Sequence, residues 1–325
     1  MKRNFLIRNI LIISLIIGIL TLMGCSPKND SKNNISIAEQ FGLAYAPLQI
    51  MKENKILEKN YPGVKIDWKQ LGNTAAIREA MLSNQVEVGF MAIPPFLIGL
   101  DKGMEWKIAS GLSESPVTLV TNSENIKSIK DFSKTSRIAL PQPGSIQHML
   151  LAMQCEKEFG DAKKLDNLLV TLAHPDGMNA LLSGKDITAH FTTPPYLFKE
   201  LEQKSTHQIL DGKDAIGADF TFIVGVTTNK FHEIKPELYK ALITSIKESI
   251  VFMKNNPDKS AEILANIYKL SKDEVLKYIT HKDMIYTDEV KGINEFAKFM
   301  KKNDYISKEY SNKNSTMWED VKYEK

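Results

Sequence analysis

The sequence predicts an α/β protein with two similar lobes that face one ligand site. Two stretches a domain's length apart lead to this prediction, residues 86–97 and 186–197. Each begins as a short apolar strand, continues through a few small or polar residues, and then reads Pro-Pro, an aromatic residue and Leu. Because proline fixes φ near its helical value and needs no N–H partner in the first helical turn, Pro-Pro after a strand predicts a helix start.

The first half of the chain alternates between strand and helix patterns. Strands are expected over residues 35–41, 64–71, 86–90, 106–111 and 117–121, and helices over 48–59 and 73–82. Asn73 and Thr74 are suited to cap the second helix, because their side chains accept bonds from orphan N–H groups. This alternation is typical of a parallel sheet with helices on both faces.

The pattern restarts at Arg137 and ends in helices. Strands are expected over 137–141, 168–172, 186–191 and 207–210, and helices over 146–159 and 176–182. We interpret 220–228 as a strand that returns to the first lobe. It is followed by helices over 236–254, 257–268, 272–279 and 289–302, the last capped by Asp288. The expected lobes are therefore 35–120 plus 225–325, and 121–224.

The N-terminus has the pattern of a secretory signal. Lys2, Arg3 and Arg8 precede an apolar run that ends in Leu22-Met23-Gly24-Cys25. The run is shorter than the ~20 apolar residues that a spanning helix needs. The polar residues that follow suit a tether. We therefore expect a signal over 1–24 and a tether over 25–34, with an uncleaved anchor and an incidental Cys25 as the alternative.

Composition excludes several classes of protein. The chain has 42 basic and 39 acidic residues, and three of the bases lie in the leader. This neutral balance gives no reason to expect a nucleic-acid partner. Cys155, the other cysteine, lies in an apolar helical run and is expected to pack there. H-E-x-x-H, C-x-x-C, G-x-S-x-G and Walker A patterns are absent from the sequence, so we expect no catalytic residue, metal ligand or cofactor.

The ligand site is expected where turns follow parallel strands, because helix N-termini there present N–H groups to anions and polar ligands. Gly144 and Ser145 could serve a ligand or simply begin a helix, and His190 could equally be a satisfied core histidine. Phe41 and Tyr45 could stack on an aromatic ligand or pack in the core. The candidate ligand-binding residues are Phe41, Gly42, Tyr45, Asn73, Thr74, Ala92, Ile93, Gly144, Ser145, Gln147, His148, Phe191, Thr192 and Thr193.

The order of these motifs resembles that of a known family. Leu22-Met23-Gly24-Cys25 resembles the bacterial lipobox, which implies cleavage before Cys25 and lipidation of its thiol. Residues 35–300 are similar to solute-binding lipoproteins of ABC importers, and most similar to the nitrate/sulfonate/taurine and thiamine-pyrimidine-precursor group. The similarity rests on Gln40-Phe41 with Ala46-Pro47, and on 65–68, 72–77, 88–91, 141–145 and 186–197.

The resemblance implies a two-lobed fold of the periplasmic-binding-protein type (type II) with a ligand cleft between the lobes. It implies a lipid-anchored extracytoplasmic protein that delivers a small solute, first of all a sulfonate or nitrate-type anion, to permease and ATPase subunits. Relatives often carry Trp-x-Pro or Trp-Asp-Pro where this chain has Phe191-Thr192-Thr193-Pro194. The missing Asp argues against a taurine-like zwitterion and leaves a simple sulfonate, another small anion or a neutral heterocycle.

Two other classes of protein are weighed against this interpretation. An enzyme on the same scaffold, such as the pyrimidine synthase relatives, would use His148 or His190 chemically, but the lipobox disfavours an enzyme that works inside the cell. A purely structural surface protein is disfavoured by the paired strand-to-helix turns.

Overall fold

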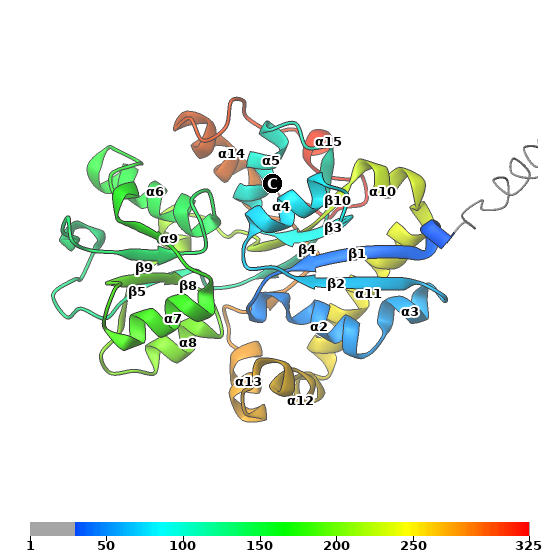
Figure 1. The fold of residues 1–325 in the computed structure, drawn as a ribbon, viewed down its shortest axis with the longest axis horizontal. Helices are drawn as coiled ribbons and strands as arrows, with labels where there is room; N and C mark the ends of the chain where they lie inside the picture. Colours follow the sequence, from blue (N-terminus) through cyan, green and yellow to red (C-terminus); the bar gives the residue numbers. More distant parts are fainter. Residues whose placement is uncertain (1–29, 325) are drawn as a thin grey trace, which may run out of the picture. The chain divides into compact units, whose positions relative to one another are not determined.

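The computed structural model describes residues 30–324, so the predicted signal and Cys25 lie outside the described residues. After a short 3-10 helix, η1 (Asp30–Asn33), residues 35–324 form one compact unit. It is a mixed α/β structure with two sheets (Figure 1). Between residues 30 and 324, none of the helices has both the length and the apolar character needed to cross a bilayer.

The first sheet has the strand order β11-β4-β10-β3-β1-β2. β1 pairs with β3 in parallel, whereas β10 runs antiparallel to both β3 and β4. Its strands are β1 (Asn34–Glu39), β2 (Lys65–Gln70), β3 (Val88–Met91), β4 (Trp106–Glu114), β10 (Ile223–Thr228) and β11 (Ile285–Tyr286).

The second sheet has the strand order β7-β6-β8-β5-β9. β6 is parallel to β7 and β8, and β5 is antiparallel to β8 and β9. This is the arrangement of the first sheet without β11, because in each sheet the antiparallel strand comes from a crossing between the two sheets. Its strands are β5 (Thr118–Thr121), β6 (Ile138–Leu140), β7 (Leu169–Thr171), β8 (Ala189–Thr192) and β9 (His207–Asp211).

The two crossings differ in part from the expected positions. Residues 117–121 were expected in the first lobe, but β5 pairs with β8 and β9 of the second sheet. The chain therefore crosses between Glu114 and Thr118, before the expected boundary at residue 120. It returns to the first sheet at Ile223, where β10 begins. Periodicity alone cannot place β5, because its partners lie about 70 to 90 residues further along the chain.

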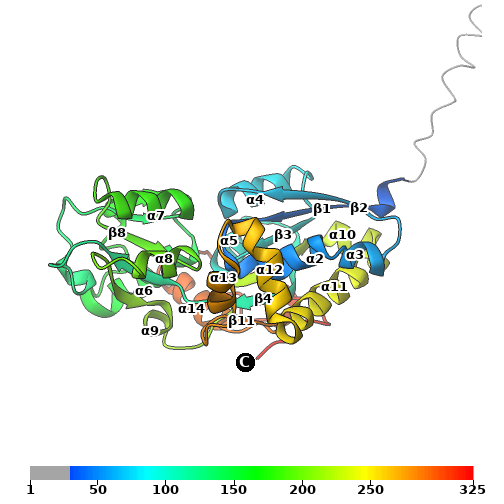
Figure 2. The same ribbon diagram turned by 90° about the horizontal axis from the view of Figure 1, so that it is seen from below.

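Helices cover both faces of each sheet. In Figure 2, α4 and α2 lie on opposite sides of the first sheet, and α7 and α6 on opposite sides of the second. Beside the sheets the helices are η2 (Leu43–Tyr45), α2 (Ala46–Glu53), α3 (Ile56–Asn60), α4 (Thr74–Leu82), α5 (Ile93–Asp101), η3 (Ile129–Asp131), α6 (Ile146–Phe159), η4 (Asp166–Leu168), α7 (His174–Ser183), α8 (Tyr196–Leu201) and α9 (Gly212–Ile216). The C-terminal helices are α10 (Asn229–Ile234), α11 (Pro236–Asn255), α12 (Pro257–Tyr268), α13 (Lys272–Ile279), α14 (Ile293–Lys302) and α15 (Lys313–Thr316).

Two expected helices have different bounds. The helix expected over 48–59 is split into α2 and α3, because Lys55 adopts the left-handed conformation with φ 51°. The last long helix begins at Ile293 after Gly292, so the prediction that Asp288 caps it was wrong. Gly292, with φ 76°, lets the chain turn into α14.

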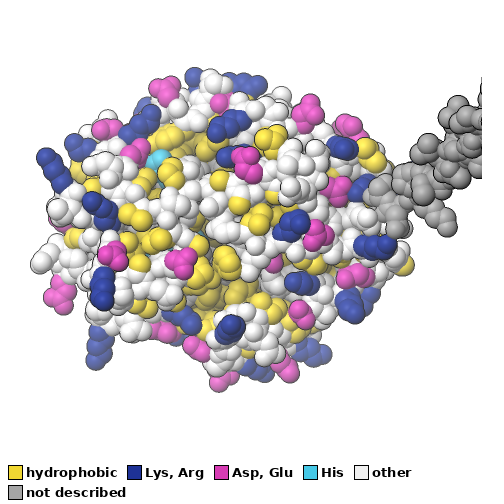
Figure 3. Space-filling view, viewed as in Figure 1, with side chains coloured by type: hydrophobic (Ala, Val, Ile, Leu, Met, Phe, Trp, Pro, Cys, Tyr) yellow, Lys and Arg dark blue, Asp and Glu magenta, His cyan; other side chains and the backbone are white. Residues whose placement is uncertain are grey.

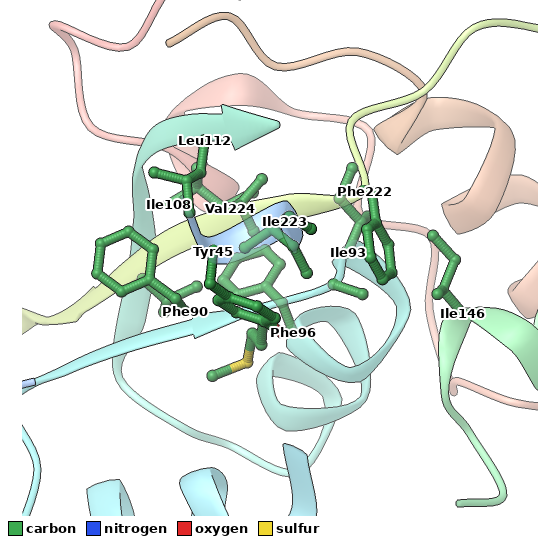
Figure 4. Packing of buried hydrophobic residues seen from close by; sticks show 14 of the residues in the cluster. Tyr45, Phe90, Ile93, Phe96, Ile108, Leu112, Ile146, Phe222, Ile223 and Val224 are labelled. Carbon is green, nitrogen blue, oxygen red and sulfur yellow. The ribbon is translucent and has the colours of Figure 1, made fainter. Parts of the chain in front are cut away.

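The hydrophobic core is continuous from one sheet to the other. Figure 4 shows Ile146 of α6 near Phe222, on the side away from Tyr45 and Phe90 of the first sheet's core. The thiol of Cys155 is buried in the same cluster, and burial raises its pKa to about 12, so it is a packed neutral group. On the face shown in Figure 3, acidic and basic side chains are interspersed around apolar ones in the middle of that face.

Candidate functional site

The strand-to-helix turns of the two sheets contact one another. The N–H of Leu43, just beyond β1, donates to the carbonyl oxygen of Pro194, just beyond β8, at 3.0 Å. The N–H of Ala75 in α4 donates to Oε1 of Gln142, beyond β6, at 2.9 Å. A Cβ atom on Gly42 would lie 3.2 Å from the Pro194 oxygen, so this approach favours glycine. The turns predicted to face a common ligand therefore meet.

A pocket of about 470 Å³ lies beside this contact. It draws on the ends of β1 and β2, on α2, on the end of α12 and on Tyr196 at the start of α8. Phe41 and Gly42 were predicted from the sequence, and the other lining residues were not. The lining residues are Glu39, Phe41, Gly42, Gln49, Lys52, Trp68, Gln70, Tyr196, Ile267, Tyr268 and Lys269.

Glu39 is the most unusual group in this pocket. It is the last residue of β1 and is only 4% exposed. Its Oε1 accepts a hydrogen bond from Nε2 of Gln49 at 2.5 Å, while its Oε2 is buried without a partner among the described residues. Burial raises the pKa of Glu39 to about 7, and the Gln49 bond and the Lys52 charge only partly oppose this rise. In the ionised form of Glu39, Oε2 is a buried acceptor without a partner, which is costly, so a ligand that donates to Oε2 would stabilise that form.

Aromatic side chains form much of the remaining wall. The Tyr268 hydroxyl donates to the Gly42 carbonyl oxygen at 2.9 Å and so ties α12 to the turn after β1. Nζ of Lys52 lies 5.9 Å from the centre of the Trp68 ring. The Tyr196 ring stacks on His174, with 6.0 Å between ring centroids. The pocket thus combines aromatic surface, two lysines and one buried carboxyl group.

The predicted residues of the first lobe outside the pocket hold its turns together. Nε2 of Gln40 donates to the Tyr45 hydroxyl at 3.1 Å and to the Thr74 hydroxyl at 3.0 Å. Asn73 caps α4, because its Oδ1 accepts from the N–H of Ala76 at 3.0 Å. The predicted residues that begin α5, its N-cap and its first residue, are buried: Ala92 and Ile93.

The turn after β6 is occupied by its own hydrogen bonds. Ser145 caps α6, because its hydroxyl accepts from the N–H of His148 at 3.3 Å. The N–H of Gly144 donates to Nδ1 of His148 at 2.9 Å, and Nε2 of His148 lies 3.0 Å from Oδ1 of Asp166. His148 therefore already has a partner at each ring nitrogen.

The expected anion cradle is consequently engaged within the protein. The backbone N–H groups of Leu43, Ala75, Ala76, Gly144 and His148 all donate to protein acceptors. A bound anion would have to displace those bonds or use other donors.

The predicted residues at the end of β8 lie at different depths. Phe191 is a fully buried core residue, and Thr193 is buried beside Gly42. The Thr192 hydroxyl is close enough to Glu200 to lower the pKa of that carboxyl, but it makes no hydrogen bond of standard geometry. The ligand-binding role of these residues stays a prediction.

A buried polar chain lies behind this wall. Nε2 of Gln147 is 3.2 Å from Nε2 of His174, whose Nδ1 is 3.2 Å from Nε2 of His190. Nδ1 of His190 is 2.6 Å from Oε1 of Glu200. Each ring nitrogen thus has one partner. Within residues 30–324, no three His, Cys, Asp or Glu side chains are grouped so that they could hold a metal ion.

Two sheets of this order, with a pocket at the carboxyl ends of their strands, define a periplasmic-binding-protein fold. The chain belongs to the NMT1/THI5 like family, whose model matches residues 60–260.

Curated relatives and solved structures agree with this assignment. A putative aliphatic sulfonates-binding protein of Bacillus subtilis is 23% identical over 312 residues, which cover 91% of each chain. The structure is similar to the alkanesulfonate-binding protein SsuA from Xanthomonas axonopodis pv. citri bound to MOPS, with a TM-score of 0.73, 16% identity and coverage of 88% of this chain and 98% of the other. It is also similar to SsuA from Escherichia coli, with a TM-score of 0.68, 19% identity and coverage of 90% and 94%.

Proposed function

We propose that this protein is the extracytoplasmic solute-binding component of an ABC importer and that it holds a small solute in the pocket beside Glu39. The family, the fold and the names of the relatives support a binding role. The leader pattern supports cleavage before Cys25 and a lipid anchor on its thiol. The permease and ATPase subunits of the importer are its expected partners.

The observation that carries the choice of solute is the free oxygen of Glu39. Buried in a pocket with Phe41, Trp68 and Tyr268, it favours a small ring that offers an N–H donor. A thiamine-precursor-like heterocycle has this chemistry. Such a solute would stack on the aromatic wall and donate to Oε2.

A sulfonate or nitrate-type anion is the second candidate. Lys52 and Lys269 line the pocket and supply positive charge. The names of the relatives from Bacillus subtilis and Escherichia coli, both putative aliphatic sulfonates-binding proteins, also favour a sulfonate. The anion would need these lysines, because the backbone N–H groups of the turns are already engaged.

The test is a binding panel measured by calorimetry and thermal shift. Methanesulfonate, nitrate, taurine and 4-amino-5-hydroxymethyl-2-methylpyrimidine are the probes. We expect the aminopyrimidine to bind without forming a product, and Glu39→Gln to weaken it at least tenfold, about 1.4 kcal/mol. Glu53→Gln is the matched control, because it removes an exposed carboxylate at the end of α2, the helix that carries Gln49 and Lys52. Tight sulfonate binding that Glu39→Gln leaves unchanged would favour the second candidate.

A further inference from the structure

The two halves of the chain contain a repeat with a constant spacing of 100 residues, from Pro94-Pro95 to Pro194-Pro195. The same spacing of 100 residues separates the helices that come before the two Pro-Pro pairs, because α4 begins at residue 74 and α7 at residue 174. Both helices are followed by a residue with positive φ, Asn84 at 58° and Gly184 at 67°. Over residues 74–100, the repeat therefore allows a residue of the first half to be compared with the residue 100 positions later in the second half.

The second half places a polar triad where the first half is mostly apolar. His174, His190 and Glu200 are the counterparts of Thr74, Phe90 and Leu100. Since the first half folds with Phe90 and Leu100 at these positions, the repeat itself does not require the triad. Buried ionisable groups are rarely the most stable choice for a core.

The fold also makes room for this triad. A Cβ atom on Gly177 would lie 2.6 Å from Nε2 of His190, so any larger residue there would collide with the ring. The counterpart of Gly177 is Ile77, which packs in the core of the first half. The glycine in α7 thus accommodates the imidazole of His190.

The triad runs from the interior of the second half toward the starts of α6 and α7. Glu200 and His190 are fully buried. His174 begins α7 after β7, and Gln147 lies in the first turn of α6 after β6. Both helix starts are at the carboxyl ends of parallel strands, and the ring of Tyr196, which lines the pocket, stacks on His174.

The placement of the Gln147 amide, with Nε2 toward His174, implies one direction for the hydrogen bonds of the chain. An amide nitrogen can only donate, so Nε2 of His174 accepts from Gln147 and its proton lies on Nδ1. Nδ1 of His174 then donates to Nε2 of His190, and Nδ1 of His190 donates to Oε1 of Glu200. The amide oxygen of Gln147 is left as the acceptor at the outer end of the chain.

We propose that Glu200, His190 and His174 are positioning residues that set the hydrogen-bond polarity of Gln147, so that the second half of the site presents an acceptor to the solute. This inference rests on the proposed function for its solute.

The protonation states of the buried groups agree with this arrangement. Burial lowers the pKa of His190 to about 3 and also lowers that of His174, so both rings are neutral near pH 7 and carry one proton each. Burial raises the pKa of Glu200 to about 9. The carboxyl is therefore uncharged near pH 7. An uncharged carboxyl can accept at Oε1 while its own proton stays on Oε2, as the direction assigned from Gln147 requires.

The direct test needs no solute. Long-range ¹⁵N–¹H NMR of histidine-labelled protein at pH 7 should show His174 and His190 as neutral Nδ1–H tautomers. Nε2–H tautomers or a charged ring in the wild-type protein would overturn the assigned direction, whatever the protein binds.

Variants of Glu200 separate positioning from simple packing. Glu200→Leu introduces the side chain of Leu100, the counterpart of Glu200 in the first half. In this variant we expect His174 to be a mixture of tautomers, and the affinity for the solute of the panel that binds best to fall about tenfold. Glu200→Gln can still accept from His190, so the tautomer should be kept and affinity should stay within threefold. An unchanged His174 tautomer in folded Glu200→Leu would overturn the positioning role, and a changed tautomer with unchanged affinity would overturn its link to the site. If Glu200→Leu does not fold, a mixture of tautomers in Glu200→Gln would also contradict the proposal.

Discussion

At the scale of single residues, burial makes Glu39 a proton-sensitive group at the wall of the pocket. Its pKa rises from 4.5 to about 7, chiefly because the carboxylate loses its hydration. The folded protein therefore binds this proton more tightly than the unfolded chain does. The contribution of Glu39 to stability is complete below pH 4.5 and is lost as the pH rises through about 7.

Glu39→Gln should remove this pH dependence. Relative to the wild type, the variant should gain on the order of 3 kcal/mol in free energy of unfolding between pH 4 and pH 8. Urea unfolding at both pH values measures it, with Glu53→Gln as the control. A constant difference between Glu39→Gln and the wild type would contradict the buried, proton-sensitive carboxyl. The same variant should bind solute more weakly, so stability and function would change in opposite directions.

At the scale of helices and strands, the sequence predicted the bounds of a helix correctly where a proline or a capping residue marks its start. α12 and α13 occupy the predicted residues, because Pro257 begins one and a capping box at Ser271 begins the other. α4 also begins at its predicted cap, Asn73. The break at Lys55 and the sheet of β5 depend on packing between distant segments, which no local pattern records.

At the candidate site, the sequence likewise predicted the local turns but missed residues that tertiary packing brings there. The turns that follow the strands were predicted, and the pairs Leu43–Pro194 and Ala75–Gln142 bring them together. Glu39 and Trp68 were missed because they lie within strands. Tyr268 was missed because it reaches the site from the distant end of α12.

Ser145 tests whether the turn after β6 serves the solute or only its helix. Its hydroxyl caps α6, so Ser145→Ala should lower the free energy of unfolding by about 1 kcal/mol. Because the cap bond occupies this hydroxyl, we expect solute affinity to change less than twofold. Ser271→Ala removes a cap far along the chain and is the control. A tenfold loss of affinity in Ser145→Ala, but not in Ser271→Ala, would contradict this expectation and indicate that the Ser145 hydroxyl contacts the solute.

At the scale of the whole molecule, two sheets share one strand order, and we propose that both contribute to a single site. Each sheet contributes the carboxyl ends of its parallel strands, and its antiparallel strand joins it to the other. The halves differ where chemistry is expected, with Glu39 in one and the chain from Gln147 to Glu200 in the other. This division suits a protein that closes on a solute.

The proposed leader and lipid anchor give a prediction at this scale. Intact mass of the protein extracted from bacterial membranes should correspond to a chain that begins at Cys25 and carries lipid. Cys25→Ala should release the protein from the membrane fraction. An unmodified chain from Met1, or a Cys25→Ala protein that stays anchored, would contradict lipidation.

Native mass spectrometry of gently purified protein tests the central claim most directly, because it detects the solute that the cell supplies. We predict that the wild-type protein carries one small nitrogen-containing ring compound, which unfolding releases intact and which Glu39→Gln loses. A bound sulfonate, or the same compound retained equally by Glu39→Gln, would contradict the claim that Glu39 selects the solute.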